Sequence, residues 1–73
     1  MAKTKSPILT ELARKVRLRR YELGLTQEQL AERANFHVNY VGGIERAGRN
    51  PSIESLVALA KALELSPKEL MPD

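Results

Sequence analysis

The feature that most constrains this sequence is a pair of short helical segments separated by about three residues. The first begins at Thr26 and continues to Ala34, and the second runs from about Val38 to Arg46. So short a connection does not allow the two helices to lie side by side as a parallel or relaxed antiparallel pair. The two helices must therefore cross at a steep angle, which is the geometry of a helix-turn-helix.

Local signals mark both ends of the first helix of this pair. Thr26 and Gln29 have the spacing of a capping box, in which each side chain bonds the backbone of the other residue. Asn35 follows the helix at a place where a left-handed residue is usual, and asparagine tolerates that conformation. Three apolar side chains at helical spacing are predicted to face a core: Leu30, Ala31 and Ala34.

Three further helical segments are predicted, at about residues 8–23, 53–64 and 66–71. Gly24 ends the first of them, Ser52 caps the next, and Ser66 with Pro67 opens the last. No stretch alternates with period two for long enough to form a strand. The expected fold is all-α, a compact five-helix bundle that contains the helix-turn-helix. The apolar residues expected inside it are Leu9, Leu12, Ala13, Val16, Ile53, Leu56, Val57, Ala60 and Leu63.

Length and composition limit the class of protein. Seventy-three residues form one domain at most, and 42% apolar with 29% charged residues is ordinary for a globular chain. There is no cysteine for a disulfide or a thiolate zinc site, and no apolar run approaches the roughly 20 residues of a membrane span. Residues 1–7 are predicted to be a flexible basic arm, and residues 8–73 to be a single domain in a cytoplasmic protein.

The charges are unevenly distributed along the chain. Residues 1–20 contain seven basic side chains and one acidic side chain, whereas residues 51–73 contain two basic and four acidic. A basic half on a small domain indicates a polyanion partner, but a solvated helix face would have the same composition. Charge alone leaves both interpretations open.

Two adjacent glycines lie in the middle of the segment from Val38 to Arg46. In a helix, Gly42 and Gly43 each cost about 1 kcal/mol relative to alanine. On that helix they fall opposite the apolar Val41 and Ile44. We expect them to allow close approach of a ligand to the backbone; the alternative is close packing of another helix.

The order and spacing of several short motifs resemble the Cro/C1-type (XRE) helix-turn-helix family of transcriptional regulators. The resemblance extends over about residues 12–71, and within the family it is greatest to the controller proteins of restriction–modification systems. The motifs are Gly24-Leu25-Thr26-Gln27, Leu30-Ala31, Tyr40-Val41, Ile44-Glu45-Arg46, Arg49-Asn50-Pro51-Ser52 and Leu65-Ser66-Pro67. The resemblance implies a lambda-repressor-like DNA-binding domain, with residues 38–46 as the recognition helix in the major groove.

The resemblance also implies which residues meet DNA. Asn39 can bond an adenine edge through its amide, and Val38 can pack on a thymine methyl. The residues expected at base edges are Val38, Asn39, Gly43 and Arg46. Those expected at the phosphate backbone are Gln27, Tyr40, Gly42, Arg49, Asn50, Arg17 and His37, with Lys3 and Lys5 as weaker candidates. The tyrosine ring has an equally good alternative role, which is packing against the preceding helix.

Other positions are expected to be structural. The family resemblance implies an internal ion pair between Arg20 and Glu45. A single histidine without cysteine offers neither a catalytic triad nor a metal cluster, so no enzyme, cofactor or small-molecule ligand is expected. A dimer surface is expected on the last two helices, at Leu59, Leu65, Leu70 and Met71; the alternative is that these residues complete the core of the monomer.

The sequence therefore predicts a homodimer that binds operator DNA and regulates transcription. The controller resemblance implies control of a restriction–modification system, with RNA polymerase as a further partner and no role for a membrane. The alternative is an antitoxin or another module whose main role is to bind a protein.

Overall fold

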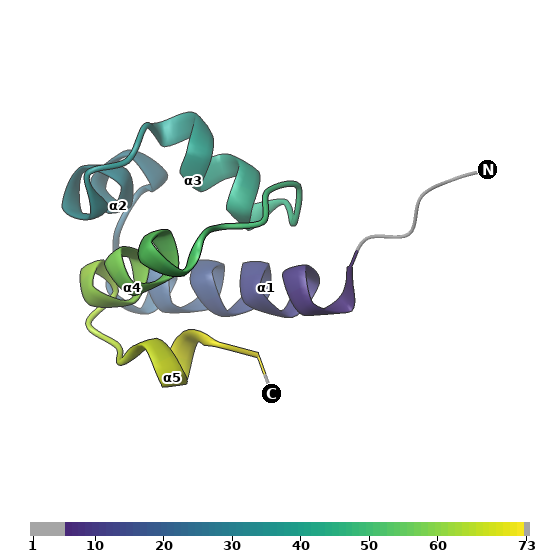
Figure 1. Ribbon diagram of the computed structural model, residues 1–73. Coiled ribbons are helices and arrows are strands. Elements are labelled where there is room, and N and C mark those ends of the chain that lie inside the picture. Colours follow the sequence, from purple (N-terminus) through teal and green to yellow (C-terminus); the bar gives the residue numbers. More distant parts are fainter. Residues whose placement is uncertain (1–5, 73) are drawn as a thin grey trace.

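Five helices are stacked in three levels in the computed structural model, which describes residues 6–72. In Figure 1, α2 and α3 lie at the top, α1 and α4 lie beneath them, and α5 lies at the bottom. The prediction of an all-α fold with a helix-turn-helix is confirmed. The helices of the described residues are α1 (Pro7–Glu22), α2 (Gln27–Ala34), α3 (Val38–Glu45), α4 (Ile53–Ala62) and α5 (Pro67–Leu70).

Each helix begins at a residue whose side chain caps the free backbone amides. Thr26 and Ser66 form the predicted capping boxes, and Ser52 accepts from the Ser55 N–H. Ser6 caps α1 and Pro7 is its first residue, so the prediction that both belong to an arm is wrong. The serine oxygen accepts a hydrogen bond from a backbone N–H that has no partner within the helix. The φ angle of proline is already close to the helical value. Residues 1–5 of the predicted arm, including Lys3 and Lys5, lie outside the described residues.

Four helices end in the same tight reversal, built around one left-handed residue. After α4, the Leu65 N–H donates to the Ala60 carbonyl at 2.9 Å, and the Glu64 N–H donates to the Lys61 carbonyl at 3.1 Å. This pair of bonds is a Schellman motif. The left-handed residues are Gly24, Asn35, Ala47 and Glu64. Gly24 and Asn35 were predicted at these positions, whereas Ala47 and Glu64 have side chains that are unusual for a left-handed residue. Helix α4 ends two residues before the predicted boundary.

The left-handed residue after α4 gives a stability prediction. Because φ of Glu64 is +60°, we expect Glu64→Gly to raise the free energy of unfolding by about 0.5–1 kcal/mol, as relief of strain exceeds the added chain entropy. The Arg33–Glu64 ion pair that is lost is exposed and contributes little. Gly24→Ala, at φ +69°, is the matched opposite change and should lower stability; urea unfolding would measure both. Equal stability of the two variants would contradict the strain argument.

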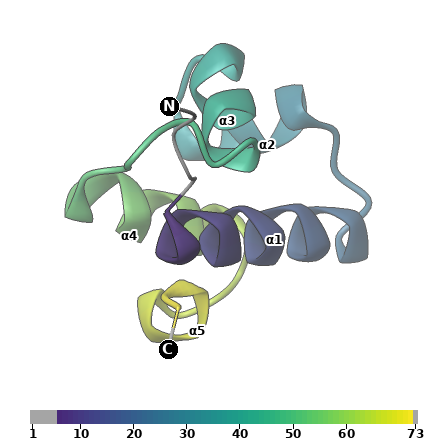
Figure 2. The same cartoon turned by 90° about the vertical axis from the view of Figure 1, so that its right-hand side faces the viewer.

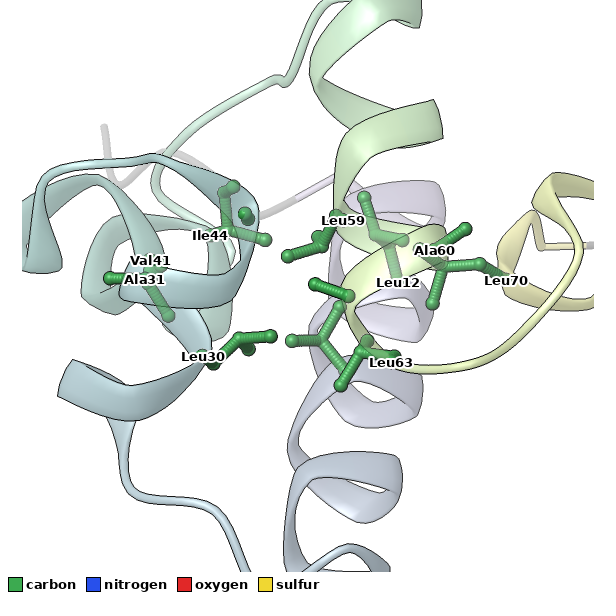
Figure 3. Close-up of a cluster of buried hydrophobic side chains, with 12 residues drawn as sticks. Leu12, Leu30, Ala31, Val41, Ile44, Leu59, Ala60, Leu63 and Leu70 are labelled. Carbon is green, nitrogen blue, oxygen red and sulfur yellow. The ribbon is translucent and has the colours of Figure 1, made fainter.

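The core lies between the levels and draws on all five helices, as Figure 3 shows. Leu30 of α2, Ile44 of α3 and Leu63, which directly follows α4, are at most 1% exposed. The prediction of a dimer surface at Leu59 and Leu70 is wrong, because both side chains are fully buried within the monomer. They complete this core, whereas Leu65 is half-buried and Met71 is exposed.

Two apolar residues predicted for the core are instead on the surface. Ile53 is 81% exposed and Val57 is 46% exposed, although their spacing matches that of the buried residues of α4. Figure 2 shows the reason, since the first turn of α4 lies at the edge of the molecule, away from α1 and α5. These two side chains lie one turn apart and form an exposed apolar face, which we call the α4 face.

The basic side chains of α1 have a structural role. Arg17 donates to the Glu45 carbonyl, Arg19 Nε donates to the Leu63 carbonyl at 2.9 Å, and Lys15 Nζ donates to the Met71 carbonyl at 2.9 Å. Cations at these positions satisfy carbonyls at or beyond the C-terminal ends of α3, α4 and α5. The excess of basic residues in α1 therefore reflects these contacts more than a polyanion surface. No helix of the described part of the chain is long and apolar enough to cross a membrane.

Candidate DNA interface

A buried carboxylate ties α3 to the two helices that precede it. Glu45 accepts from Arg20 Nε at 2.7 Å, from Arg20 Nη2 at 2.9 Å and from Gln27 Nε2 at 3.0 Å. The predicted ion pair is confirmed, with side chains only 9% and 2% exposed. The hydrogen bonds from Arg20 to Glu45 raise the pKa of the Arg20 guanidinium. Arg20 Nη1 also donates to the Leu25 carbonyl, and the crossing of α2 and α3 is thereby fixed from α1.

The opposite side of α3 faces away from the core, at the top of the molecule in Figure 1. Val41 and Ile44 are buried on the inner side, at 0% and 1% exposure. The 3.6-residue period then places four residues on the outer side: Asn39, Gly42, Gly43 and Arg46. The Asn39 side-chain amide is exposed and has no hydrogen-bonding partner within residues 6–72. It is therefore available to an external ligand.

The two glycines face outward, yet both are buried. A β-carbon built on Gly42 would lie 3.0 Å from Arg46 Nη1, and one built on Gly43 would lie 2.6 Å from Arg49 Cγ. Arginine side chains therefore cover both glycines, and the expected close approach of a ligand to their backbone stays a prediction. The alternative of close helix packing holds in part for Gly42, because Oε1 of Gln27, the first residue of α2, would lie 3.8 Å from a β-carbon at this position.

Val38 and Tyr40 lie at the margins of the outer side. Val38 is half-buried and packs partly against the core, which leaves less of it for the predicted thymine contact. The Tyr40 ring meets Phe36 edge-on, with centroids 5.0 Å apart at 83°. Tyr40 therefore has a packing role, but its ring packs on Phe36 in the turn between α2 and α3, whereas the prediction was packing on the preceding helix.

The other five predicted phosphate contacts, besides Tyr40 and Gly42, fall into two groups. Arg49, Asn50 and His37 are exposed. Arg17 and the Gln27 side chain are half-buried and donate to Glu45, so these two side chains are occupied within the protein. The first i→i−4 bond of α2 comes from the Leu30 N–H, so the backbone amides of residues 27 and 28 have no acceptor within the helix. Gln27 can thus meet an anion through its amide, which is the usual chemistry of a helix N-terminus.

His37 has a role that sequence reasoning missed. Its Nδ1 accepts from the Asn39 N–H at 3.0 Å, so the histidine caps the start of α3 beside the exposed asparagine. Its place directly before the helix could have indicated this, although histidine is not a usual cap. Among the described residues, no group of three or more histidine, aspartate or glutamate side chains could hold a metal ion.

A short α2, a three-residue turn and an outward-facing α3 define the helix-turn-helix class of DNA-binding domains. The family described as helix-turn-helix, HTH_3, matches residues 14–70, and the chain belongs to this family, as the XRE-type resemblance predicted. The protein is therefore a helix-turn-helix transcription regulator.

Its relatives include controllers of restriction–modification systems. The control protein C.SmaI of Serratia marcescens is 45% identical over 60 residues, which cover 82% of this chain and 71% of the relative. The controller C.AhdI of Aeromonas hydrophila has a similar structure, with TM-score 0.84, 40% identity and coverage of 86% and 96% of the two chains. C.Esp1396I bound to a 25-base-pair operator gives TM-score 0.82 at 38% identity, with coverage of 89% and 86%.

Proposed function

We propose that the protein binds operator DNA as a homodimer and controls transcription of a restriction–modification system. The observation that carries the proposal is the outer side of α3, where the Asn39 side-chain amide is exposed and has no hydrogen-bonding partner among residues 6–72. An amide there can bond an adenine edge, and the fixed crossing from α2 presents it to the major groove. Such a regulator works where its operator lies, in the cytoplasm, with RNA polymerase as a further partner.

A single copy of α3 reads too few bases to define one site in a genome. Two copies placed about 34 Å apart would read two half-sites separated by one turn of DNA. The α4 face is the best candidate for joining them, because Ile53 and Val57 are large apolar side chains exposed in the monomer. Leu65 and Met71 remain candidates for the same interface. An antitoxin role is not favoured, because the relatives of this chain include control proteins.

The proposal is tested by selecting bound sites from random duplexes at a stated salt concentration. We expect the wild-type protein to select two related half-sites about one turn apart. If the duplexes recovered at moderate ionic strength shared no common sequence, the proposal would be contradicted. Because non-specific binding depends steeply on salt, the selection must be repeated at two salt concentrations.

Asn39→Ala is expected to lose preference at one base pair per half-site. The cost should be about 1–3 kcal/mol at that position, because one bidentate contact is removed while the phosphate contacts remain. Binding to a panel of singly substituted operators would measure it. Asn50→Ala is the contrasting variant and should weaken all panel members alike. An unchanged preference profile for Asn39→Ala would exclude Asn39 as a base reader.

A further inference from the structure

The side chain of Arg49 lies in the space that Gly43 leaves on the outer side of α3. A β-carbon on Gly43 would lie 2.6 Å from Arg49 Cγ, 3.6 Å from its Cβ and 3.7 Å from its Cδ. The aliphatic stem therefore crosses directly over the glycine, at a distance that no substituted residue permits. This explains why Gly43 is buried although it faces away from the core.

The charged end of Arg49 has a second contact. Its Cζ lies 5.8 Å from the centroid of the Tyr40 ring, and this ring is held in turn by its edge-on contact with Phe36. A cation over an aromatic face is attracted to it, and the planar guanidinium is well suited to that contact. The aliphatic stem of Arg49 thus contacts α3 at Gly43, and its guanidinium contacts α3 at Tyr40.

The backbone after α3 returns Arg49 to this position. Ala47 is left-handed, at φ +59°, and the Gly48 N–H donates to the Gly43 carbonyl at 2.9 Å. The chain therefore reverses within two residues of the helix end. A residue outside α3 in sequence is in this way added to its outer side.

We propose that Gly43 is a positioning residue for Arg49, and that Arg49 reads a guanine in the major groove. The inference rests on the proposed function and deepens it. A phosphate contact tolerates a freely moving cation, whereas bidentate bonding to guanine O6 and N7 needs a guanidinium held in a set direction. The two supports on α3 provide such a direction.

The test compares site selection by the wild-type protein with that of Gly43→Ala, Arg49→Ala and the double variant. We expect each single variant to lose a tenfold to hundredfold preference for guanine at the same position of the half-site. The double variant should lose no more than Arg49→Ala alone, because both changes remove one contact. Gly48→Ala is the matched control, since its β-carbon would meet the nearest atom, the Gly43 carbonyl oxygen, at an ordinary 3.6 Å.

Two further measurements keep the outcomes distinct. Arg49→Lys leaves α3 untouched and keeps the charge, so it should fold normally and keep only a reduced guanine preference, because its ammonium can donate to guanine but lacks the planar fork. In the free protein, the Arg49 side-chain proton signals should show the ring current of Tyr40 in the wild type and lose it in Gly43→Ala. Uniform weakening of all sequences by Arg49→Ala, with a salt slope reduced by about one, would overturn the inference in favour of a phosphate contact. Failure of the wild-type protein to select any site would instead overturn the proposed function.

Discussion

Glu45→Ala is expected to lower the free energy of unfolding by about 3–5 kcal/mol. The change leaves the Arg20 guanidinium buried without its counter-ion and removes three hydrogen bonds that join α1 and α2 to α3. A single small core of this size rarely supplies more than about 3–5 kcal/mol, so the variant should be largely unfolded at 25 °C. Urea unfolding followed by circular dichroism would measure the loss, at one fixed protein concentration because dimerisation adds stability.

Two controls separate the buried pair from a general effect of losing a carboxylate. Glu32→Ala removes an exposed glutamate from α2 and should change stability by less than about 0.5 kcal/mol. The double variant Arg20→Met with Glu45→Leu removes both charges and should recover much of the loss. A single variant as stable as the wild type would show that the ion pair does not hold the helix-turn-helix together.

The second large effect is expected at the α4 face. Val57→Asp should abolish the homodimer and reduce operator affinity by about a thousandfold, toward the level of non-specific binding. The reason is that a carboxylate would be buried in an apolar interface, and each monomer would then hold only one half-site. Sedimentation equilibrium and operator titration would measure the two consequences.

Leu18→Asp provides the matched control for this change. Leu18 lies on α1 and is 50% exposed, close to the 46% of Val57, but it lies outside the α4 face. It should leave both the dimer and operator binding intact. Dissociation of the dimer by Leu18→Asp, or its persistence in Val57→Asp, would show that the interface lies elsewhere.

Most of the fold followed from local signals in the sequence. The capping boxes at Thr26 and Ser66 act within one turn of helix, so they could be recognised without any tertiary information. Ile53 and Val57 were misplaced because helical periodicity shows which side chains share a face but not how far the neighbouring helices extend. Leu59 and Leu70 were misplaced for the complementary reason, since α4 and α5 cover each other's apolar sides.

The site was less predictable than the fold. The outer side of α3 and its opposition to Val41 and Ile44 follow from the 3.6-residue period. The placement of Arg49 over Gly43 does not, because it depends on a reversal around Ala47, which has no sequence signal for a left-handed conformation. The internal bonds of Gln27 and Arg17 were also missed, since both join residues that are far apart in the chain.

The anchoring of α3 through Glu45 has an evolutionary consequence. The side-chain hydrogen bonds that join α3 to α1 and α2 lie on its inner side, so the exposed side chains at positions 39 and 49 can be exchanged at little cost to folding. A lineage could thereby acquire a new target sequence through a few surface changes while keeping the same scaffold. Sister regulators that share one cell could then diverge in the promoters they recognise and avoid cross-regulation.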